Sequence, residues 1–390
     1  MEKAEEKLNN LLLQIAEEQN YDKYILKIVP ISSGGANYTS TLFNVTVYEG
    51  NNEIHMFAKV AAIGEKMRSQ IPKIYKTENF AYTKLLKVYD RLQDECQVPQ
   101  EHRLKFPKFY GSNIKEYEET IVLEDLAKDG YQAYDRFATF DWEYAKSSLR
   151  ELAKMHALSF AYDESHPEEF KAIAEDLKVD WDLEKPENKA YYDCTVGKTL
   201  TLVSEEIRKK MEKYFETMAK DAFPEYYKFI RRPVLGHGDF RPSNLMHKIL
   251  DDGSIDIKIV DLQTLQGGSP VIDLLYFLIT GSDEAFRAQY YEKCLEHYYT
   301  ELAAAMKRLH LDPEKVYSRE DFDFELNKKL PFGLTIAVFS LPIITVEVEN
   351  APKVGADMDL STFSVDKPSD LYSERLNGVI NDYIKWGVLK

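Results

Sequence analysis

The first third of the chain combines helical and strand patterns of apolar residues. Residues 4–18 carry leucine and isoleucine at helical spacing, which predicts an amphipathic helix. Two β-rich stretches within residues 31–48 flank a pair of glycines, and residues 54–60 and 120–125 have the pattern of further strands. We therefore expect a small lobe, residues 1–126, that contains an antiparallel sheet.

Helical periodicity dominates the remainder of the chain. Residues 141–162 place apolar side chains and His156 on one face, and we take this histidine as a satisfied core residue. The longest uncharged run, residues 330–346, contains two prolines and a glycine, so we interpret it as buried core rather than a bilayer span. The pattern predicts an α+β protein in which residues 127–390 form a larger, mainly helical C-terminal lobe.

The predicted helix over residues 74–92 carries one acid on its apolar face. Glu78 shares that face with tyrosines and leucines, so its carboxylate needs a cation. Lys59, near the end of an apolar strand, is the candidate partner. Taken alone, Glu78 could lie in solvent at the edge of the face, and Lys59 could reach water from an edge strand. Together they resemble the lysine–glutamate pair with which kinases position the α- and β-phosphates of ATP.

The segment from Leu235 to Gln263 carries the strongest chemical pattern. Asp252 and Gly253 are typical of a two-residue type I′ hairpin turn, which would place Asp251 opposite Ser254. Counting outward along the strands then places Asn244 opposite Asp261, with their Cβ atoms about 4.5–5.5 Å apart. An amide oxygen and a carboxylate at the mouth of this hairpin fit a Mg²⁺ ion, which takes oxygen ligands and keeps several waters.

Asp239 precedes Asn244 by five residues. In kinases an aspartate so placed accepts the hydroxyl proton, while the asparagine and a second aspartate hold metal ions on the phosphates. The spacing alone is common by chance, and the alternative is a solvated turn between two core strands. Asp273, near the start of the apolar run 271–280, is either a first-turn acid favoured by the helix dipole or a hydrogen-bond acceptor beneath this loop. We favour the second interpretation.

The expected nucleotide contacts lie around the glycine pair and at the end of the last N-terminal strand. A turn over residues 33–40 can lay backbone amides over phosphates, since glycine lets the chain approach closely, although most such pairs are only turns. Backbone groups near Glu124 and Leu126 would meet the adenine. The candidate nucleotide-binding residues are Ser33, Gly34, Gly35, Asn37, Lys59, Glu78, Glu124 and Leu126.

Charge and cysteine content narrow the class of protein. The net charge of −16 argues against nucleic acid or an anionic membrane as the main partner, so an ATP-binding site here must concentrate cations locally. The 3 cysteines are widely separated and suit neither a disulfide framework nor a zinc site. The charged N-terminus does not resemble a signal peptide, and we expect a cytoplasmic, monomeric protein.

These residues together resemble the ecdysteroid-kinase-like (CHK kinase-like) family of the aminoglycoside phosphotransferase and choline kinase superfamily. The resemblance spans residues 33 to 278 and is carried by Gly34-Gly35-Ala-Asn-Tyr-Thr-Ser40, Val122-Leu-Glu-Asp-Leu126, Leu152-Ala-Lys-Met-His-Ala157, Leu235-Gly-His-Gly-Asp239 with Asn244, Asp261-Leu-Gln263 and Ser269-Pro-Val-Ile-Asp273-Leu-Leu-Tyr-Phe277. It implies a bilobal protein-kinase-like fold, ATP and Mg²⁺ as co-substrates, and phosphorylation of a small-molecule hydroxyl. Members often have Trp where this chain has Arg241, a difference that bears on the acceptor contacts.

We therefore expect an ATP-dependent small-molecule phosphotransferase with Asp239 as base and with Asn244 and Asp261 on Mg²⁺. A protein kinase fits poorly, because Pro270 follows Asp261 after only nine positions, too few for an activation segment. A kinase fold that binds a ligand without turnover is the second alternative. For the acceptor we expect a steroid such as an ecdysteroid in preference to choline or an aminoglycoside, because Arg241 would repel a cation and the downstream helices offer apolar surface.

Overall fold

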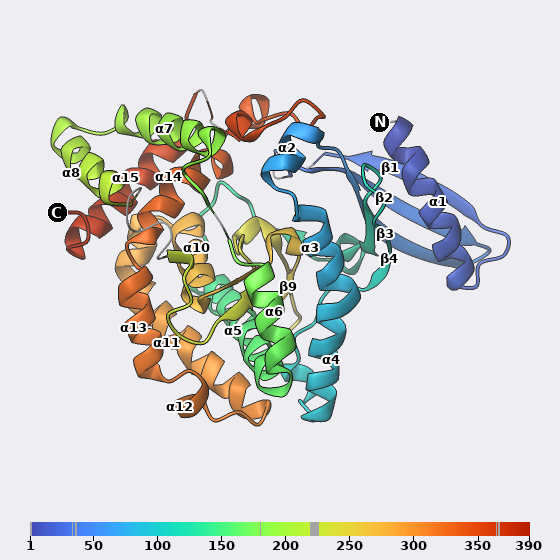
Figure 1. The fold of residues 1–390 in the computed structure, drawn as a ribbon. Coiled ribbons are helices and arrows are strands. Elements are labelled where there is room, and N and C mark those ends of the chain that lie inside the picture. The colour runs from blue at the N-terminus through green and yellow to red at the C-terminus, as the bar shows by residue number, and fades with distance from the viewer. Residues whose placement is uncertain are drawn as a thin grey trace.

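An antiparallel sheet forms the N-terminal part of the protein. The computed structural model describes residues 2–32, 34–35, 37–179, 181–218, 226–363, 365 and 367–390. Within these ranges the sheet has 5 strands in the order β1-β2-β3-β5-β4. They are β1 (Ile25–Ile31), β2 (Ser40–Glu49), β3 (Asn52–Ala61), β4 (Phe109–Asn113) and β5 (Thr120–Glu124). Figure 1 shows this lobe on the right, with β1 to β4 labelled and the blue helix α1 lying against the sheet.

Helix α1 (Glu2–Glu18) confirms the amphipathic helix predicted near the N-terminus. Its apolar face packs on β2 and β3, and Leu8 and Leu12 are fully buried there. A fully buried leucine contributes about 1.5–3 kcal/mol relative to an exposed one. Gly111 in β4 allows this approach, since a Cβ there would lie 3.2 Å from Ile15. Helix α1 therefore closes one face of the sheet and leaves the other face to the rest of the molecule.

The helix predicted over residues 74–92 is continuous but not uniform. It consists of α3 (Ile74–Phe80), a π-helical turn (Ala81–Leu85) and α4 (Leu86–Glu95), and a short helix α2 (Glu65–Gln70) precedes it. The predicted apolar face is confirmed, since Glu78 is 2% exposed and Tyr82 and Tyr89 are buried with it. The π-turn was not predicted, because the extra residue leaves the apolar spacing nearly unchanged.

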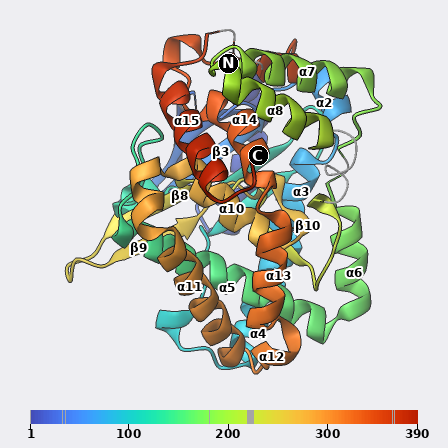
Figure 2. The same cartoon turned by 90° about the vertical axis from the view of Figure 1, so that its left-hand side faces the viewer.

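Helices make up most of the C-terminal part, as expected. Figure 2 shows them stacked across the body of the molecule, and the yellow hairpin of β8 and β9 projects from one side. The helices are α5 (Trp142–Ser165), α6 (Pro167–Asp176), α7 (Pro186–Leu200), α8 (Glu205–Thr217), α10 (Pro270–Gly281), α11 (Glu284–Arg308), α12 (Pro313–Val316), α13 (Arg319–Lys329), α14 (Phe332–Ile344) and α15 (Asp370–Lys385). The short strands are β6 (Gln132–Ala133), β7 (Val234–Gly236), β8 (Leu245–Ile249), β9 (Ile255–Ile259) and β10 (Gln266–Gly268). Across the described ranges, no helix is both long enough and apolar enough to span a bilayer.

The hairpin register differs from the prediction by one residue. Ile249 pairs with Ile255, and Leu250 N donates to Ser254 O at 2.8 Å, so a three-residue loop replaces the two-residue turn. Gly253 N donates to Leu250 O at 2.9 Å and Gly253 has φ +80°. This is a type I turn followed by a left-handed glycine, the usual geometry of a three-residue hairpin. The assignment of Asp251 opposite Ser254 is therefore wrong.

Consequently Asn244 does not face Asp261. Val260 N donates to Asn244 O at 3.0 Å, so the residue opposite Asn244 is Val260. A one-residue slip would normally turn a side chain to the other face of a ladder. Asp261 follows the end of β9 and has a left-handed backbone, φ +66°, which redirects its side chain. Asn244 and Asp261 therefore line one cavity, although the predicted register was wrong by one residue.

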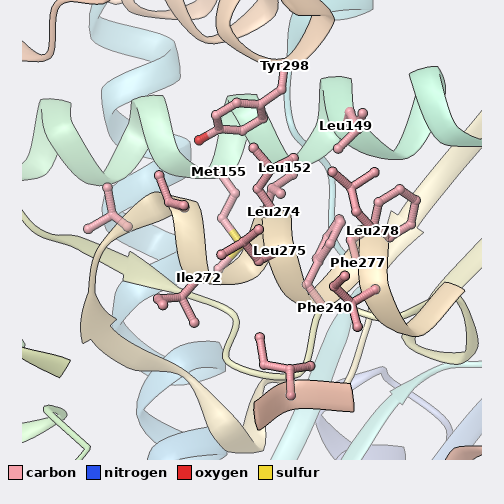
Figure 3. Close-up of a cluster of buried hydrophobic side chains, with 14 of the residues drawn as sticks. Leu149, Leu152, Met155, Phe240, Ile272, Leu274, Leu275, Phe277, Leu278 and Tyr298 are labelled. Carbon is pink, nitrogen blue, oxygen red and sulfur yellow. The ribbon is translucent and has the colours of Figure 1, made fainter. Parts of the chain in front are cut away.

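A continuous apolar core lies beneath the segment that carries Asp239. Phe240 is completely buried, and its ring lies 5.5 Å from that of Phe277 in α10. Figure 3 shows Phe240 among side chains of α10 and α5, with Leu274, Phe277 and Leu278 around it and Leu152 and Met155 beyond. Phe240, the residue after Asp239, thus packs in the core and fixes the position of the chain next to Asp239.

Candidate active site

The loop around Asp239 is shaped by two glycines and one buried aspartate. Gly238 has φ +80°, and a Cβ at this position would lie 2.1 Å from Thr264 O. A Cβ on Gly236 would lie 2.6 Å from Asp273 Oδ2. Only glycine fits both positions without displacing backbone or the aspartate. The Gly-His-Gly sequence therefore lets the loop pack directly on the start of α10.

Asp273 holds this loop from below, as predicted. Its Oδ2 accepts from His237 N at 2.7 Å, and its Oδ1 accepts from Gly238 N at 2.8 Å. His156 Nε2 lies 3.1 Å from Oδ2, and His156 is fully buried, which confirms it as a satisfied core histidine. Burial raises the pKa of the Asp273 carboxyl, but the hydrogen bond to His156 and the backbone donors outweigh burial and hold the pKa below its ordinary value.

Two side chains donate hydrogen bonds to Asp239. Its Oδ2 accepts from Asn244 Nδ2 at 2.9 Å and from Arg241 Nε at 3.0 Å. Tyr276 of α10 lies near enough for the charge of Asp239 to act on it. Burial and the negative charge of Asp239 raise the pKa of Tyr276 well above its ordinary value, so the tyrosine stays neutral. The carboxylate is thus fixed in orientation before any ligand binds.

A buried ion-pair trio lies beside Asp239. The predicted pair of Lys59 and Glu78 is confirmed, with 2.8 Å between Lys59 Nζ and Glu78 Oε1. Lys59 Nζ also lies 2.5 Å from Asp261 Oδ1, a contact that was not predicted. One ammonium therefore joins the small lobe to the hairpin.

The pKa shifts in the trio follow from two acids sharing one cation. Burial alone would lower the pKa of Lys59, but Asp261 and Glu78 raise it above its ordinary value. Burial raises the pKa of Asp261 too, yet Lys59 outweighs burial and the pKa lies below its ordinary value. The pKa of Glu78 lies above its ordinary value, because burial outweighs its pairing with Lys59. Lys59 Nζ lies closer to Asp261 than to Glu78, and two carboxylates with one ammonium give the trio one net negative charge.

These groups face a cavity of about 350 Å³, which we call the charged cavity. Of the residues predicted to meet a nucleotide or metal, the ones in its wall are Asn37, Lys59, Glu78, Glu124, Leu126, Asn244 and Asp261. Gly34 and Gly35 do not line it, and Ser33 lies outside the described residues. The apolar part of the wall comes from Leu42, Phe57, Leu123, Met246 and Val260. The wall of the cavity thus combines apolar and charged side chains, a combination that suits a nucleotide.

The glycine turn is joined to the C-terminal lobe by Arg136. Its guanidinium donates to Gly34 O at 3.1 Å, to Ile344 O at 2.7 Å and to Val346 O at 2.7 Å. Gly34 and Gly35 have φ values of +59° and +82°, which non-glycine residues rarely adopt. The turn therefore has the conformation expected of glycine, and its position depends on the chain after α14.

The charged cavity offers ligands that fit one Mg²⁺ ion. Asn244 turns Nδ2 toward Asp239, which leaves its amide oxygen as an acceptor, and Asp261 supplies a carboxylate in the same wall. In the part of the chain that the structure describes, no cluster of three or more His, Cys, Asp or Glu side chains could hold a metal. Mg²⁺ needs no such cluster when one or two protein oxygens act together with phosphates and water.

A second cavity, of about 420 Å³, adjoins the loop that carries Asp239, and we call it the aromatic cavity. Gly238 and Tyr276 belong to its wall, and α14 contributes Phe332 and Phe339. The remaining lining residues are Trp181, Tyr191, Tyr227, Thr264, Gln266, Ile272, Thr335, Ile336, Ser340 and Leu360. Among the described residues that line this cavity, none carries a charge.

The sequence matches the family model described as the ecdysteroid kinase-like family over residues 34–311. The chain belongs to the ecdysteroid kinase-like family. The predicted resemblance is thereby confirmed, together with the bilobal kinase-like fold. No curated protein matches the sequence.

Solved structures similar to this chain include two phosphate-transferring enzymes. The chain is similar to wild-type aminoglycoside 2′-phosphotransferase-IIIa in its GDP complex, at 14% identity and a TM-score of 0.46, with 96% of this chain and 99% of that chain covered. It is also similar to a glucosamine kinase in complex with glucosamine, ADP and inorganic phosphate, at 13% identity and a TM-score of 0.38, with 86% of this chain and 80% of that chain covered.

Two further residues of this ecdysteroid kinase-like chain, Tyr276 and Gln263, were not predicted from its sequence to lie at the site. Tyr276 was assigned only to an apolar helix, and nothing in its spacing indicates that it lies near Asp239. Gln263 accepts from Thr39 Oγ1 at 3.0 Å and lies 3.4 Å from Asp261, so it joins the two lobes beside the trio. Its position two residues after Asp261 was the only available signal. Both positions depend on tertiary packing.

Proposed function

We propose that this protein is an ATP- and Mg²⁺-dependent kinase that phosphorylates a hydroxyl group of a small molecule. Family membership supports a small-molecule kinase. The observation that carries the rest is the position of Asp239, which accepts from Asn244 in the wall of the charged cavity and directly follows Gly238 in the wall of the aromatic cavity. A base between two cavities of different character suits transfer from one ligand to another.

Each side chain has a defined part in this proposal. Asp239 orients the acceptor hydroxyl and takes its proton. Lys59, held by Glu78, binds the α- and β-phosphates, and Asn244 with Asp261 binds Mg²⁺, which neutralises phosphate charge. Glu124 and Leu126 lie at the adenine end, with Ser33, Gly34, Gly35 and Asn37 on the phosphate side. The work is mainly positioning and charge neutralisation.

The lobes are taken as residues 1–126 and 127–390, since β5 ends at Glu124 and a short 3₁₀ helix starts at Leu126. The proposal also includes a monomer in the cytoplasm. Cys96, Cys194 and Cys294, which all belong to the described residues, form no disulfide, and this agrees with a reducing compartment.

For the acceptor we propose a largely apolar, hydroxylated molecule such as an ecdysteroid. The aromatic cavity supports this choice, because its described lining offers rings, hydroxyls and one amide but no charge. Its volume of about 420 Å³ lies in the range of small-molecule sites. Arg241, 3.0 Å from Asp239, would repel a cationic acceptor. Choline or an aminoglycoside would need carboxylates, or for choline an aromatic cage close to the base.

A competition assay tests the proposal. The full chain is incubated with ATP and Mg²⁺ and an ecdysteroid, choline and an aminoglycoside at equal concentrations, and phosphorylated products are measured by mass spectrometry. We expect the steroid phosphate to dominate and to vanish when Mg²⁺ is chelated. Preferential phosphorylation of either cation would overturn the acceptor assignment. Nucleotide binding without any product across a wider library of hydroxylated metabolites would favour the alternative, a kinase fold that binds without turnover.

A further inference from the structure

Arg241 is a buried cation next to the proposed base. Its side chain is 8% exposed overall, and Nε, one of five guanidinium N–H groups, donates to Asp239 Oδ2 at 3.0 Å. Burial alone would lower the pKa of Arg241, but the charges of Asp239 and its neighbours raise it above its ordinary value, so the guanidinium stays charged. Burying an ion costs several kcal/mol unless compensating interactions are made. A cation at this point therefore needs an explanation.

A second guanidinium, that of Arg136, lies close by, and Asp135 and Glu347 act on it without forming a close ion pair. Arg136 donates to three backbone carbonyl groups, and within the described ranges no carboxylate forms an ion pair with it. Burial lowers the pKa of Arg136, and the positive charge of Arg241 lowers it further. Arg136 and Arg241 also border the same small cavity, of about 10 Å³. The positive charges of Arg136 and Arg241 thus lie close together, and Arg241 contacts Asp239.

Three cations lie near the three carboxylates formed by Asp239 and the trio. Asp239, Asp261 and Glu78 supply three carboxylates, and Lys59, Arg136 and Arg241 supply three cations. Without the two arginines the same site would carry two net negative charges, which repel phosphate. The arginines therefore add positive charge beside Asp239, and the small cavity that they border shares Ser243 with the charged cavity.

An unpartnered hydroxyl lies in the same place. Ser243 lines the charged cavity and also borders the small cavity shared by the two arginines. Its Oγ is buried and has no hydrogen-bond partner among the residues that the structure describes. A buried polar group left unsatisfied costs about 1–3 kcal/mol. The cost is recovered if a ligand oxygen binds there.

We propose that Arg241, together with Ser243, holds the terminal phosphoryl group of ATP as it passes to the acceptor. In this step the acceptor oxygen forms a bond to the terminal phosphorus, the bond from that phosphorus to the ADP oxygen breaks with its electron pair going to ADP, and the acceptor proton goes to Asp239. Arg241 donates N–H groups to the non-bridging oxygens, where a planar guanidinium fits best. The positive charge of Arg136, which borders the same small cavity as Arg241, adds to the electrostatic attraction for the phosphoryl group. The inference rests on the proposed function and assigns a role to the residue that stands where family members often have Trp.

Binding of two nucleotides to the full chain tests this role. Dissociation constants for ADP and for a non-hydrolysable ATP analogue, both with Mg²⁺, are measured by calorimetry for the wild type, Arg241→Gln, Arg241→Lys and Ser243→Ala. We expect Arg241→Gln to weaken the analogue at least tenfold while ADP affinity stays within twofold. For Arg241→Lys the dissociation constant of the analogue should lie between those of the wild type and Arg241→Gln. Ser243→Ala should weaken binding of the analogue severalfold. Arg232→Gln, which loses a distant ion pair with Asp163, is the matched control and should change neither constant.

The outcomes separate this inference from the proposed function. A merely structural role for Arg241 would weaken both nucleotides equally or neither, and either result overturns the inference while leaving the kinase proposal standing. Failure of the wild type to bind both nucleotides would overturn the proposed function, and the inference with it. If thermal unfolding shows that Arg241→Gln does not fold, the test uses Arg241→Lys and Ser243→Ala. If both variants keep the wild-type ratio of the two dissociation constants, for the analogue and for ADP, the proposed role of Arg241 is overturned.

Discussion

The charged cavity and the aromatic cavity differ in how their polar groups are satisfied. In the charged cavity Lys59, Glu78 and Asp261 are buried ions that compensate one another. In the aromatic cavity the polar groups are neutral, and Tyr276 lies near both Ser340 and Asp239. Buried charges must be paired or they destabilise the fold, whereas neutral groups need only hydrogen bonds. The first cavity is therefore suited to a charged ligand and the second to a neutral one.

This difference means that the two ligands should be separable by mutation. Substitution of Lys59 should change the affinity for the nucleotide, and substitution of Ser340 should change the affinity for the acceptor. Substitution of Asp239 should leave both affinities unchanged and slow the transfer. Of the four predictions below, which begin with the largest expected effect, three test this separation and one tests how Asp273 holds the loop that carries Asp239.

Asp239→Asn should reduce the rate of transfer by about 10²–10⁴-fold, the usual contribution of a general base. The amide keeps an oxygen for Asn244 and Arg241, so the loop should keep its shape. Steady-state kinetics give the rate, and calorimetry gives nucleotide affinity, which should stay within a few-fold. A tenfold loss of nucleotide affinity, about 1.4 kcal/mol, would show that Asp239 belongs to the nucleotide site.

Lys59→Met should weaken binding of ADP and of ATP analogues by tenfold or more. It also leaves Glu78 and Asp261 without their cation, and breaking a buried pair costs about 3–5 kcal/mol of stability. Calorimetry on protein shown to be folded by circular dichroism separates the two effects. The acceptor affinity serves as the internal control, and its loss in parallel with nucleotide affinity would contradict the separation of the two cavities.

The pairing of Lys59 with Glu78 could be predicted because it depends on local patterns. A lone acid on an apolar helical face needs a cation, and one lysine in a neighbouring strand was available. The extra contact with Asp261 could not be predicted, because it depends on where the hairpin packs against the small lobe. The same holds for Tyr276 and Gln263, whose neighbours at the site lie 37 and 224 positions away in sequence.

The hairpin register shows how a short motif can mislead. Asp-Gly favours a two-residue turn, but it also suits a three-residue loop whose last residue is a left-handed glycine. Here Asp252 accepts from Ser254 N at 2.9 Å, and this side-chain contact accompanies the longer loop. The predicted partner of Asn244 was therefore wrong by one position, yet the left-handed backbone at Asp261 still brings Asn244 and Asp261 to one cavity. The order of elements was therefore easier to predict than their register.

Asp273→Asn should destabilise the fold by about 1.5–3 kcal/mol near neutral pH, the range for hydrogen bonds to a charged group. Because the pKa of Asp273 in the fold lies below the unfolded value of about 3.9, its contribution is complete above that pH and is lost as pH falls through the folded pKa. Urea unfolding of wild type and variant from pH 7 to pH 3 measures this. The difference in unfolding free energy should be constant down to about pH 4 and then shrink.

That shrinking difference is specific to an aspartate that is ionised in the fold. A difference that stays constant through the acid range would mean that Asp273 acts only by packing. Asp273→Glu gives a second check, since it keeps the charge but alters the distances to His237 N and Gly238 N, now 2.7 and 2.8 Å.

Ser340→Asp should change acceptor preference, and its effect should be the smallest of the four. The substitution places a carboxylate in a cavity wall whose described residues are all neutral. A carboxylate about 4 Å from a cationic acceptor contributes about 1 kcal/mol where water screens it well, equivalent to a roughly fivefold change in the choline-to-steroid ratio of kcat/KM. Ser340→Asn is the matched control, since it has the same shape without the charge, and it should leave this ratio within twofold. Competition assays with both acceptors give the ratio, and ADP affinity should be unchanged in both variants. An equal change in Ser340→Asp and Ser340→Asn would mean that shape, and not the absence of charge, sets the preference of the aromatic cavity.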